Sequence, residues 1–123
     1  MNVYITPRIE KTRSLHIDSL NKDAKVFIYL NNVSANENGP YGYVLGSHKY
    51  KIFYYLWMKI YNFLPSALKI NLRVTDCVFF KSKDAQFFKG KPGTLICSLQ
   101  NGAHRGYAQT SKDSRIVLVT HYE

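Results

Sequence analysis

At 123 residues the chain has the length of one domain and can bury a real hydrophobic core. A hydrophobic content of 46% and an aromatic content of 15% predict a folded protein and argue against disorder. The formal net charge is +9, from 17 basic and 8 acidic residues, but the basic residues are scattered along the chain. We therefore expect a solvated basic surface and no nucleic-acid partner, with an anionic substrate or partner as the second interpretation.

Apolar side chains that alternate along the chain, many of them β-branched or aromatic, predict a mainly β protein. Strands are expected at 2–6, 12–17, 25–33, 41–45, 77–80, 86–88, 94–98, 103–108 and 115–122. Turns that contain glycine, asparagine or proline separate them, notably at 34–40 and 89–93. Short strands separated by such turns are typical of a sandwich or barrel, and we expect a double-stranded β-helix (jelly roll) core.

The segment 49–64 has helical periodicity instead, and Pro65 ends it. Its apolar residues are interrupted by Lys51, Lys59 and Asn62, and it is shorter than the roughly 20 apolar residues of a membrane span. We expect one helix here, packed over the sheet, and no membrane partner. A lid over the active site or a contact with a membrane surface is the alternative interpretation.

The N-terminal residues and the two cysteines bear on the cellular compartment. Residues 1–14 carry charges and no apolar run, so they do not predict a signal peptide. Cys77 and Cys97 lack the spacing of a metal site, and free thiols are favoured over a disulfide. Both observations favour a cytoplasmic location.

His16 and Asp18 form an HxD pair, and His104 and Arg115 follow much later in the chain. Alternate residues of a strand share a face, so His16 and Asp18 can face one metal ion while Ile17 points away. Two imidazoles and one carboxylate are the ligand set of non-haem iron(II), although zinc could also bind them. We expect His104 to supply the third ligand from a strand across the barrel, 86 positions after Asp18. Arg115 could grip the far carboxylate of a dicarboxylic co-substrate.

Several short words of sequence occur in an order and spacing that strengthen this interpretation. They are KVFIYLNNV at 25–33, ENGP at 37–40, GSHK at 46–49, GTL at 93–95, GAHRG at 102–106 and SRIVLV at 114–119. From about Ser14 to Tyr122 the chain resembles the phytanoyl-CoA dioxygenase family of iron(II)/2-oxoglutarate-dependent oxygenases. Asn32, Leu45 and Ser98 depart from the family pattern, but none is a proposed ligand.

The resemblance implies an enzyme in which His16, Asp18 and His104 are the catalytic metal ligands for Fe(II) and Arg115 binds 2-oxoglutarate. Dioxygen is then the second co-substrate, and 2-oxoglutarate is decarboxylated to succinate. The expected reaction is hydroxylation of a small organic substrate or an anionic conjugate; the shared fold does not identify it. His48 is expected to be structural and His121 to lie on the surface.

Only fifteen residues precede His16, whereas members of the family carry a long N-terminal region there. We therefore expect residues 1–123 to form a single jelly-roll oxygenase domain that corresponds to the C-terminal part of the family domain. An N-terminal partner segment or self-association would then complete it. The alternative function is a degenerate or truncated jelly-roll binding module that keeps the iron ligands without efficient turnover.

Overall fold

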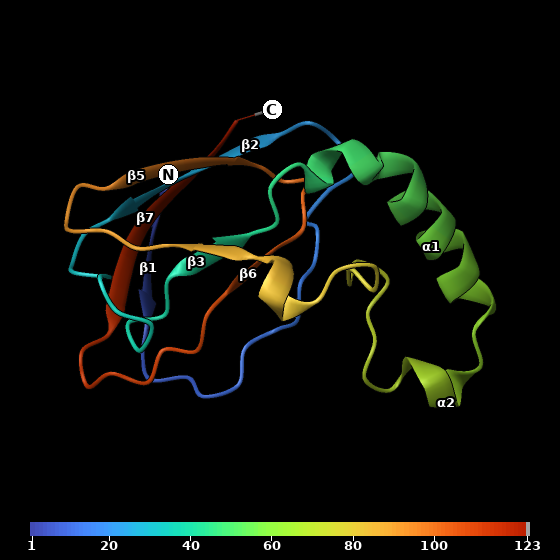
Figure 1. Ribbon diagram of the computed structural model, residues 1–123, viewed down its shortest axis with the longest axis horizontal. Coiled ribbons are helices and arrows are strands. Elements are labelled where there is room, and N and C mark those ends of the chain that lie inside the picture. Colours follow the sequence, from blue (N-terminus) through green and yellow to red (C-terminus); the bar gives the residue numbers. More distant parts are fainter. Residues whose placement is uncertain (123) are drawn as a thin grey trace.

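The computed structural model describes residues 1–122, so Glu123 of the expected domain lies outside the described residues. Two antiparallel sheets face each other (Figure 1). The four-stranded sheet has the order β1 (Asn2–Thr6), β7 (Arg115–Tyr122), β2 (Ala24–Tyr29) and β5 (Leu95–Leu99). The three-stranded sheet has the order β4 (Gln86–Phe88), β3 (Tyr41–Tyr43) and β6 (His104–Gly106). The chain is thus mainly β, and this arrangement is compatible with a jelly roll.

The segment around His16 extends the three-stranded sheet beyond β6. His16 pairs with His104 on one side and with Asp76 on the other, each through an isolated antiparallel bridge. The backbone N–H of Ile17 donates to the carbonyl of Thr75 at 3.0 Å. The predicted strand at 12–17 is therefore wrong as a regular strand, although its end lies in a sheet. Within residues 12–17, only His16 forms β-bridges, so the segment is not paired continuously along its length.

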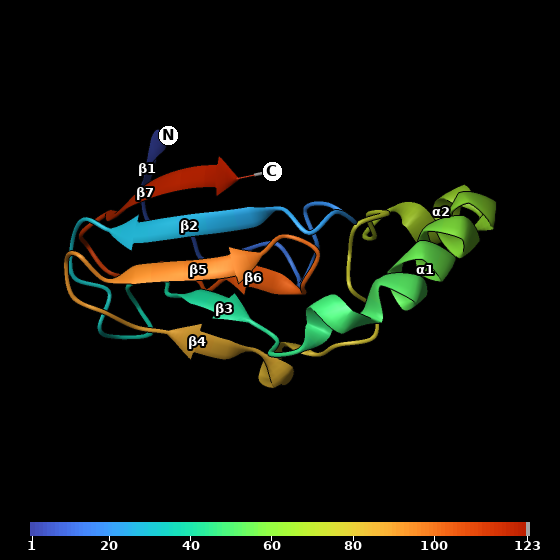
Figure 2. The same cartoon turned by 90° about the horizontal axis from the view of Figure 1, so that it is seen from above.

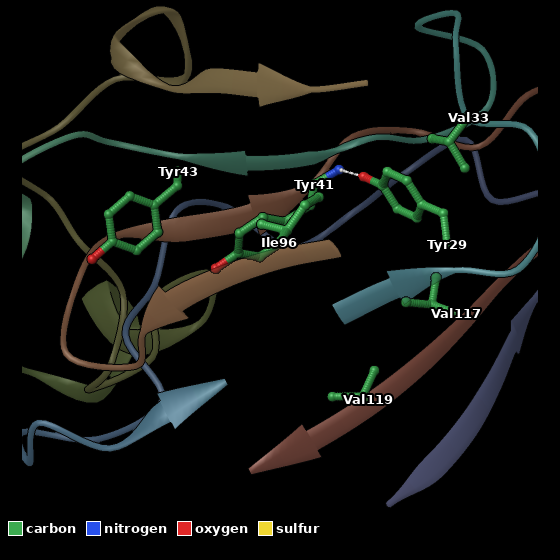
Figure 3. Packing of buried hydrophobic residues seen from close by; sticks show 7 residues of the cluster. All are labelled: Tyr29, Val33, Tyr41, Tyr43, Ile96, Val117 and Val119. Atoms are coloured by element: carbon green, nitrogen blue, oxygen red, sulfur yellow. Dashed lines mark hydrogen bonds between the residues drawn. The ribbon is translucent and has the colours of Figure 1, made fainter. Parts of the chain in front are cut away.

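The main core lies between the two sheets, where the alternation of the strands turns every second side chain inward (Figure 3). Tyr29 connects the sheets through its hydroxyl, which donates to the carbonyl of Phe88 at 2.8 Å and accepts from the N–H of Tyr41 at 3.0 Å. The buried members of this cluster are Tyr29, Val33, Tyr41, Tyr43, Ile96, Val117 and Val119.

The predicted helix at 49–64 is confirmed, but the expectation that it packs over the sheet is wrong, because it projects from one end of the two sheets (Figure 2). A 3-10 turn, η1 (Ser47–Tyr50), leads into α1 (Lys51–Phe63), and two shorter turns of helix follow, α2 (Ser66–Lys69) and η2 (Ser82–Asp84). Helices α1 and α2 extend away from one end of the two sheets (Figure 2). The buried Tyr54 of α1 packs in a second cluster with Leu15, Ile17, Val44, Cys77 and Ala103. The same helix therefore supports the back of the HxD segment, where Ile17 points away from its neighbours as predicted.

Most of the remaining strand predictions are confirmed with small shifts at their ends, and two need correction. The strand predicted at 25–33 ends at Tyr29. Beyond it, the side chain of Asn31 bonds to the neighbouring backbone in place of a main-chain pair: it donates to the carbonyl of Ser114 and accepts from the N–H of Ile116. Residues 77–80 form a turn and no strand, with the N–H of Phe80 donating to the carbonyl of Cys77. Their apolar side chains pack against α1, where Phe79 contacts Phe53.

Two other predictions concern thiols and membranes. Cys77 and Cys97 are both free, as predicted, with Cys77 buried and Cys97 exposed. Within residues 1–122, no helix has the length and apolar character that a membrane crossing requires.

Candidate metal centre and co-substrate cavity

The structure brings His16, Asp18 and His104 together, as the sequence analysis predicted. Their ligand atoms all lie within 4.8 Å of one another. The Nε2 atom of His16 is 3.6 Å from Asp18 Oδ1, and Nε2 of His104 is 3.3 Å from Asp18 Oδ2. The side chain of His104 is 6% exposed and that of Asp18 is 26% exposed, so the cluster is reached from one side. The three residues form a group that could hold a metal ion.

The two histidines are neighbours in one sheet, and the expectation that His104 reaches the metal from across the barrel is wrong. The N–H of His16 donates to the carbonyl of His104 at 3.0 Å, and the N–H of His104 donates to the carbonyl of His16 at 2.9 Å. Their ring centroids are 4.6 Å apart. The reason is that β6 lies between β3 and the HxD segment in the same sheet. The two histidines are therefore adjacent in space although they lie far apart in the sequence.

Each imidazole has its Nδ1 atom engaged by a nearby backbone carbonyl. Nδ1 of His16 is 2.9 Å from the carbonyl oxygen of Ser14, and Nδ1 of His104 is 2.9 Å from that of Gly102. Nδ1 is therefore the protonated nitrogen of a neutral ring, and Nε2 keeps its lone pair for a metal. Burial lowers the pKa of His16 to about 4, so this ring is neutral at pH 7.

Asp18 is held as a carboxylate by Lys25. The ammonium of Lys25, on β2, pairs with Oδ2 of Asp18. Burial acts to raise the pKa of the Asp18 carboxyl, but the close contacts with His104 and Lys25 outweigh it and hold the pKa well below its ordinary value. At neutral pH His16 is thus a neutral imidazole and Asp18 an ionised carboxylate, and together with the imidazole of His104 they form a donor set that fits iron(II).

A cavity of about 320 Å³ opens between the sheets beside the cluster. Its walls come mainly from the inward-facing side chains of the four-stranded sheet and from β3 and β6. The lining residues are Tyr4, Thr6, His16, Lys25, Phe27, Tyr29, Tyr41, His104, Gly106, Arg115, Val117, Val119 and His121. The cavity therefore contains two of the three proposed ligands together with Arg115.

Arg115 lies at the start of β7 and presents a partly satisfied guanidinium to this cavity. Its Nη1 donates to the carbonyl of Gly39 and its Nη2 to the hydroxyl of Thr6 at 3.3 Å. The Nε atom is buried and has no hydrogen-bond partner, and within residues 1–122 no carboxylate pairs with the group. Burial lowers the pKa of Arg115, but the guanidinium stays a cation at neutral pH. A half-buried cation with a buried and unpaired Nε favours an anionic ligand.

Gly106 relates Arg115 to the metal cluster. It lies two residues after His104 on β6, so both face the same side, about 6.6 Å apart along the strand. A Cβ atom placed on Gly106 would lie 3.6 Å from Arg115 Nη1. His104, Gly106 and Arg115 line the same cavity, and a side chain larger than a methyl group at Gly106 would lie against the guanidinium.

Sequence reasoning missed two polar residues at the site. Lys25 was not singled out, and His121, although exposed, lines the cavity instead of being plain surface. The two are direct partners across β2 and β7. The alternation along the strand could have identified Lys25, because it lies on the same face as Phe27 and Tyr29. By contrast, His48 lies outside the cluster, as expected, and its backbone carbonyl accepts a bond from Asn101 Nδ2.

Comparison with solved structures relates the fold to non-haem oxygenases. The chain is similar to the nickel complex of the non-haem monooxygenase ThoJ, with a TM-score of 0.63 and 15% identity over 98% of this chain and 41% of ThoJ. It is similar to the α-ketoglutarate-dependent epimerase SnoN from nogalamycin biosynthesis, with a TM-score of 0.64 and 14% identity over 98% of this chain and 46% of SnoN. It is also similar to HygX from Streptomyces hygroscopicus with nickel and 2-oxoglutarate bound, with a TM-score of 0.58 and 15% identity over 99% of this chain and 58% of HygX.

These similarities establish the fold that the chain shares with enzymes of this class. The chain spans between 41% and 58% of the length of these three structures. No protein-family model matches the chain, and no curated protein matches it either. The resemblance to the phytanoyl-CoA dioxygenase family is therefore supported at the level of the wider oxygenase fold, not at the level of that family.

Proposed function

We propose that the protein is an iron(II)/2-oxoglutarate-dependent oxygenase with a jelly-roll core that works in the cytoplasm. The observation that carries the proposal is one cavity lined by His16 and His104, with Asp18 beside them, and by a half-buried arginine that pairs with no carboxylate of residues 1–122. The similarity to enzymes that bind nickel or 2-oxoglutarate supports it. The free thiols Cys77 and Cys97 suit the expected compartment.

In this proposal, residues at one end of the cavity bind the metal and a residue at the other end binds the co-substrate. His16, Asp18 and His104 hold the metal, which when bound supplies the activation of dioxygen with 2-oxoglutarate as co-substrate. Arg115 binds the distal carboxylate of 2-oxoglutarate. Lys25 keeps Asp18 ionised and oriented.

The cavity wall suggests the kind of substrate. Phe27, Tyr29 and Tyr41 form an aromatic side, and Lys25 and His121 add basic groups where β2 and β7 pair. An aromatic wall with basic neighbours favours a small organic molecule or an anionic conjugate. We propose hydroxylation of such a substrate as the reaction.

The test is an anaerobic titration of the iron(II)-loaded protein with 2-oxoglutarate, followed by measurement of dioxygen consumption. We expect saturable binding and dioxygen uptake that depends on 2-oxoglutarate. Arg115→Lys should weaken 2-oxoglutarate binding about tenfold, because an ammonium does not reproduce the bidentate contact. Gly106→Val should weaken it at least as much, since the new side chain would cover the guanidinium, and iron affinity should not change.

Arg105 provides the matched control. Its guanidinium points to the other side of β6, where it donates to Ser82 and Thr12. Arg105→Lys should leave 2-oxoglutarate binding as in the wild type. If Arg115→Lys and Gly106→Val also titrate like the wild type, Arg115 is not the co-substrate anchor. Iron binding without any 2-oxoglutarate-dependent uptake would favour the alternative, a binding module without turnover.

A further inference from the structure

Helix α1 carries large apolar side chains on the face that is turned away from the protein. Ile52 is 65% exposed, Leu56 50%, Ile60 56% and Phe63 88%. Their spacing of four, four and three residues places them on one side of the helix, which we call the outer face of α1. The opposite side holds the buried Tyr54. A surface helix normally has a polar outer face, so this helix is apolar on the side where water would be expected.

The charges around the outer face have one sign. No acidic residue occurs between Glu37 and Asp76. Within residues 1–122, none of the basic residues in that interval pairs with a carboxylate. Lys59 and Lys69 instead lie over the rings of Tyr55 and Tyr61, at 5.3 and 5.2 Å. The basic residues of the interval are Lys49, Lys51, Lys59, Lys69 and Arg73.

We propose that the outer face of α1 docks on the surface of an anionic lipid bilayer, with the helix lying flat in the headgroup region. The helix is about 20 Å long and projects from the end of the sheets, so nothing in the described fold prevents a flat approach (Figure 2). Apolar side chains enter the boundary between headgroups and acyl chains, and lysines beside them meet the anionic headgroups.

Charge and chemistry favour lipid over the other occupants of such a face. A second copy of the chain would bring its own cluster of unpaired cations against the first, and like charges repel. A nucleic acid would pair with the lysines but would gain little from the aliphatic Ile52, Leu56 and Ile60, since nucleic acids are bound through charge, stacking and base-edge contacts. A bilayer with anionic lipids satisfies both the charge and the apolar side chains.

This inference departs from the expectation of no membrane partner, and it revives the membrane-surface alternative raised by the sequence of 49–64. It concerns adsorption to a surface, not insertion across a membrane. It agrees with a cytoplasmic location, because the cytoplasmic leaflet carries a negative surface potential. It does not depend on the metal, so it can be tested independently of the proposed enzymatic activity.

The experiment is cosedimentation of the full chain with phosphatidylcholine vesicles that contain or lack phosphatidylserine. Trp57, the one tryptophan of the chain, lies on α1 with its indole Nε1 buried, off the outer face, so the pelleted fraction of protein is the readout. We expect binding to the phosphatidylserine vesicles. Binding should weaken as salt is added, and it should be much weaker on phosphatidylcholine alone.

Two sets of variants separate the apolar and the charged contributions. Leu56→Ser combined with Phe63→Ser should lower the partition coefficient at least about tenfold. Leu95→Ser is the matched control, because Leu95 is 61% exposed on β5, away from α1. Lys51→Gln and Lys59→Gln should each lower binding to anionic vesicles about fivefold. Lys112→Gln, in the loop before β7, should not change it.

Four results would overturn the inference. They are no binding to anionic vesicles, binding that the α1 variants leave unchanged, and equal binding to vesicles without phosphatidylserine. The fourth is capture of single-stranded RNA, or dimer formation, that the same variants abolish while vesicles do not bind at all. Circular dichroism checks that each variant keeps its fold, which we expect because all six substituted residues are exposed.

Discussion

The two ends of the cavity differ in how the charge of their side chains is compensated. At the metal end, Asp18 is compensated: Lys25 pairs with it and His104 lies within hydrogen-bond reach. At the other end, Arg115 is a half-buried cation whose partners are a backbone carbonyl and a hydroxyl, with no carboxylate in the described part of the chain. The metal end is electrostatically complete in the protein alone. The Arg115 end is not, and an incoming anion would complete it.

The two ends are also held in place by different kinds of interaction. Reciprocal backbone hydrogen bonds between His16 and His104 fix two of the three ligands. The Arg115 end depends on a single side chain and on the missing side chain of Gly106. Substitutions at the metal end should therefore act on metal binding and on stability, whereas those at Arg115 should act on anion binding with little cost in stability.

The largest effect is expected from removal of a ligand. His16→Ala, Asp18→Ala and His104→Ala should each lower iron(II) affinity at least about a thousandfold, because loss of even an outer-shell partner commonly costs 10–100-fold. Anaerobic metal titration measures this. His48→Ala and His121→Ala serve as controls and should retain stoichiometric binding. Equal iron(II) binding by the wild type and Asp18→Ala would show that this carboxylate is not a metal ligand.

A second effect concerns pH in the metal-free protein. The pKa of His16 is about 4 in the folded state and 6.5 ordinarily, so the unfolded chain takes up this proton first as the pH falls. The free energy of unfolding should therefore decrease by about 3 kcal/mol between about pH 7 and pH 4. Asp18, whose folded pKa is lowered, adds a further loss as the pH falls through its ordinary pKa.

Urea denaturation at several pH values measures this change. In His16→Gln the decrease between about pH 7 and pH 4 should be largely absent, because no imidazole remains to titrate at this position. A wild-type profile that is flat over this range would show that His16 is not held neutral by its surroundings.

The smallest effect should distinguish the ends by stability alone. Arg115→Met removes a half-buried cation that has no counter-ion among residues 1–122, so the free energy of unfolding should stay unchanged or rise by up to about 1 kcal/mol. Asp18→Asn leaves Lys25 without its anion and should lower that free energy by about 1–2 kcal/mol. Thermal denaturation of both variants in metal-free buffer checks the sign. A clear loss of stability in Arg115→Met would mean that the arginine is structural.

The regular elements were predictable because their patterns are local. The strand at 115–122 has the predicted bounds, and the helix at 49–64 differs from α1 mainly by the 3-10 turn before it. Alternation also placed His16 and Asp18 on one side and Ile17 on the other. The strand prediction at 77–80 failed because these residues are apolar for packing against α1, and an apolar run does not reveal whether its backbone is paired.

Long-range pairing was the part of the site that local patterns could not supply. No period in the sequence indicates that His16 and His104 are direct neighbours, because this depends on the order of strands in the second sheet. Lys25 was overlooked for a different reason. Its strand was recognised, but a lysine at the start of a strand is usually solvated, and its role follows from the position of Asp18.

The pairing of His16 with His104 also has a consequence for biosynthesis. Translation produces His16 and Asp18 long before His104, and the intervening 85 residues contain most of the two sheets. A nascent chain therefore offers an incoming ion only two of its three ligands until β6 has emerged and paired. Long-range closure of this kind is slow compared with local folding. Completion of the three-residue cluster would thus report that β6 has paired with the HxD segment, and an ion of any kind would find no finished site on a shorter nascent chain.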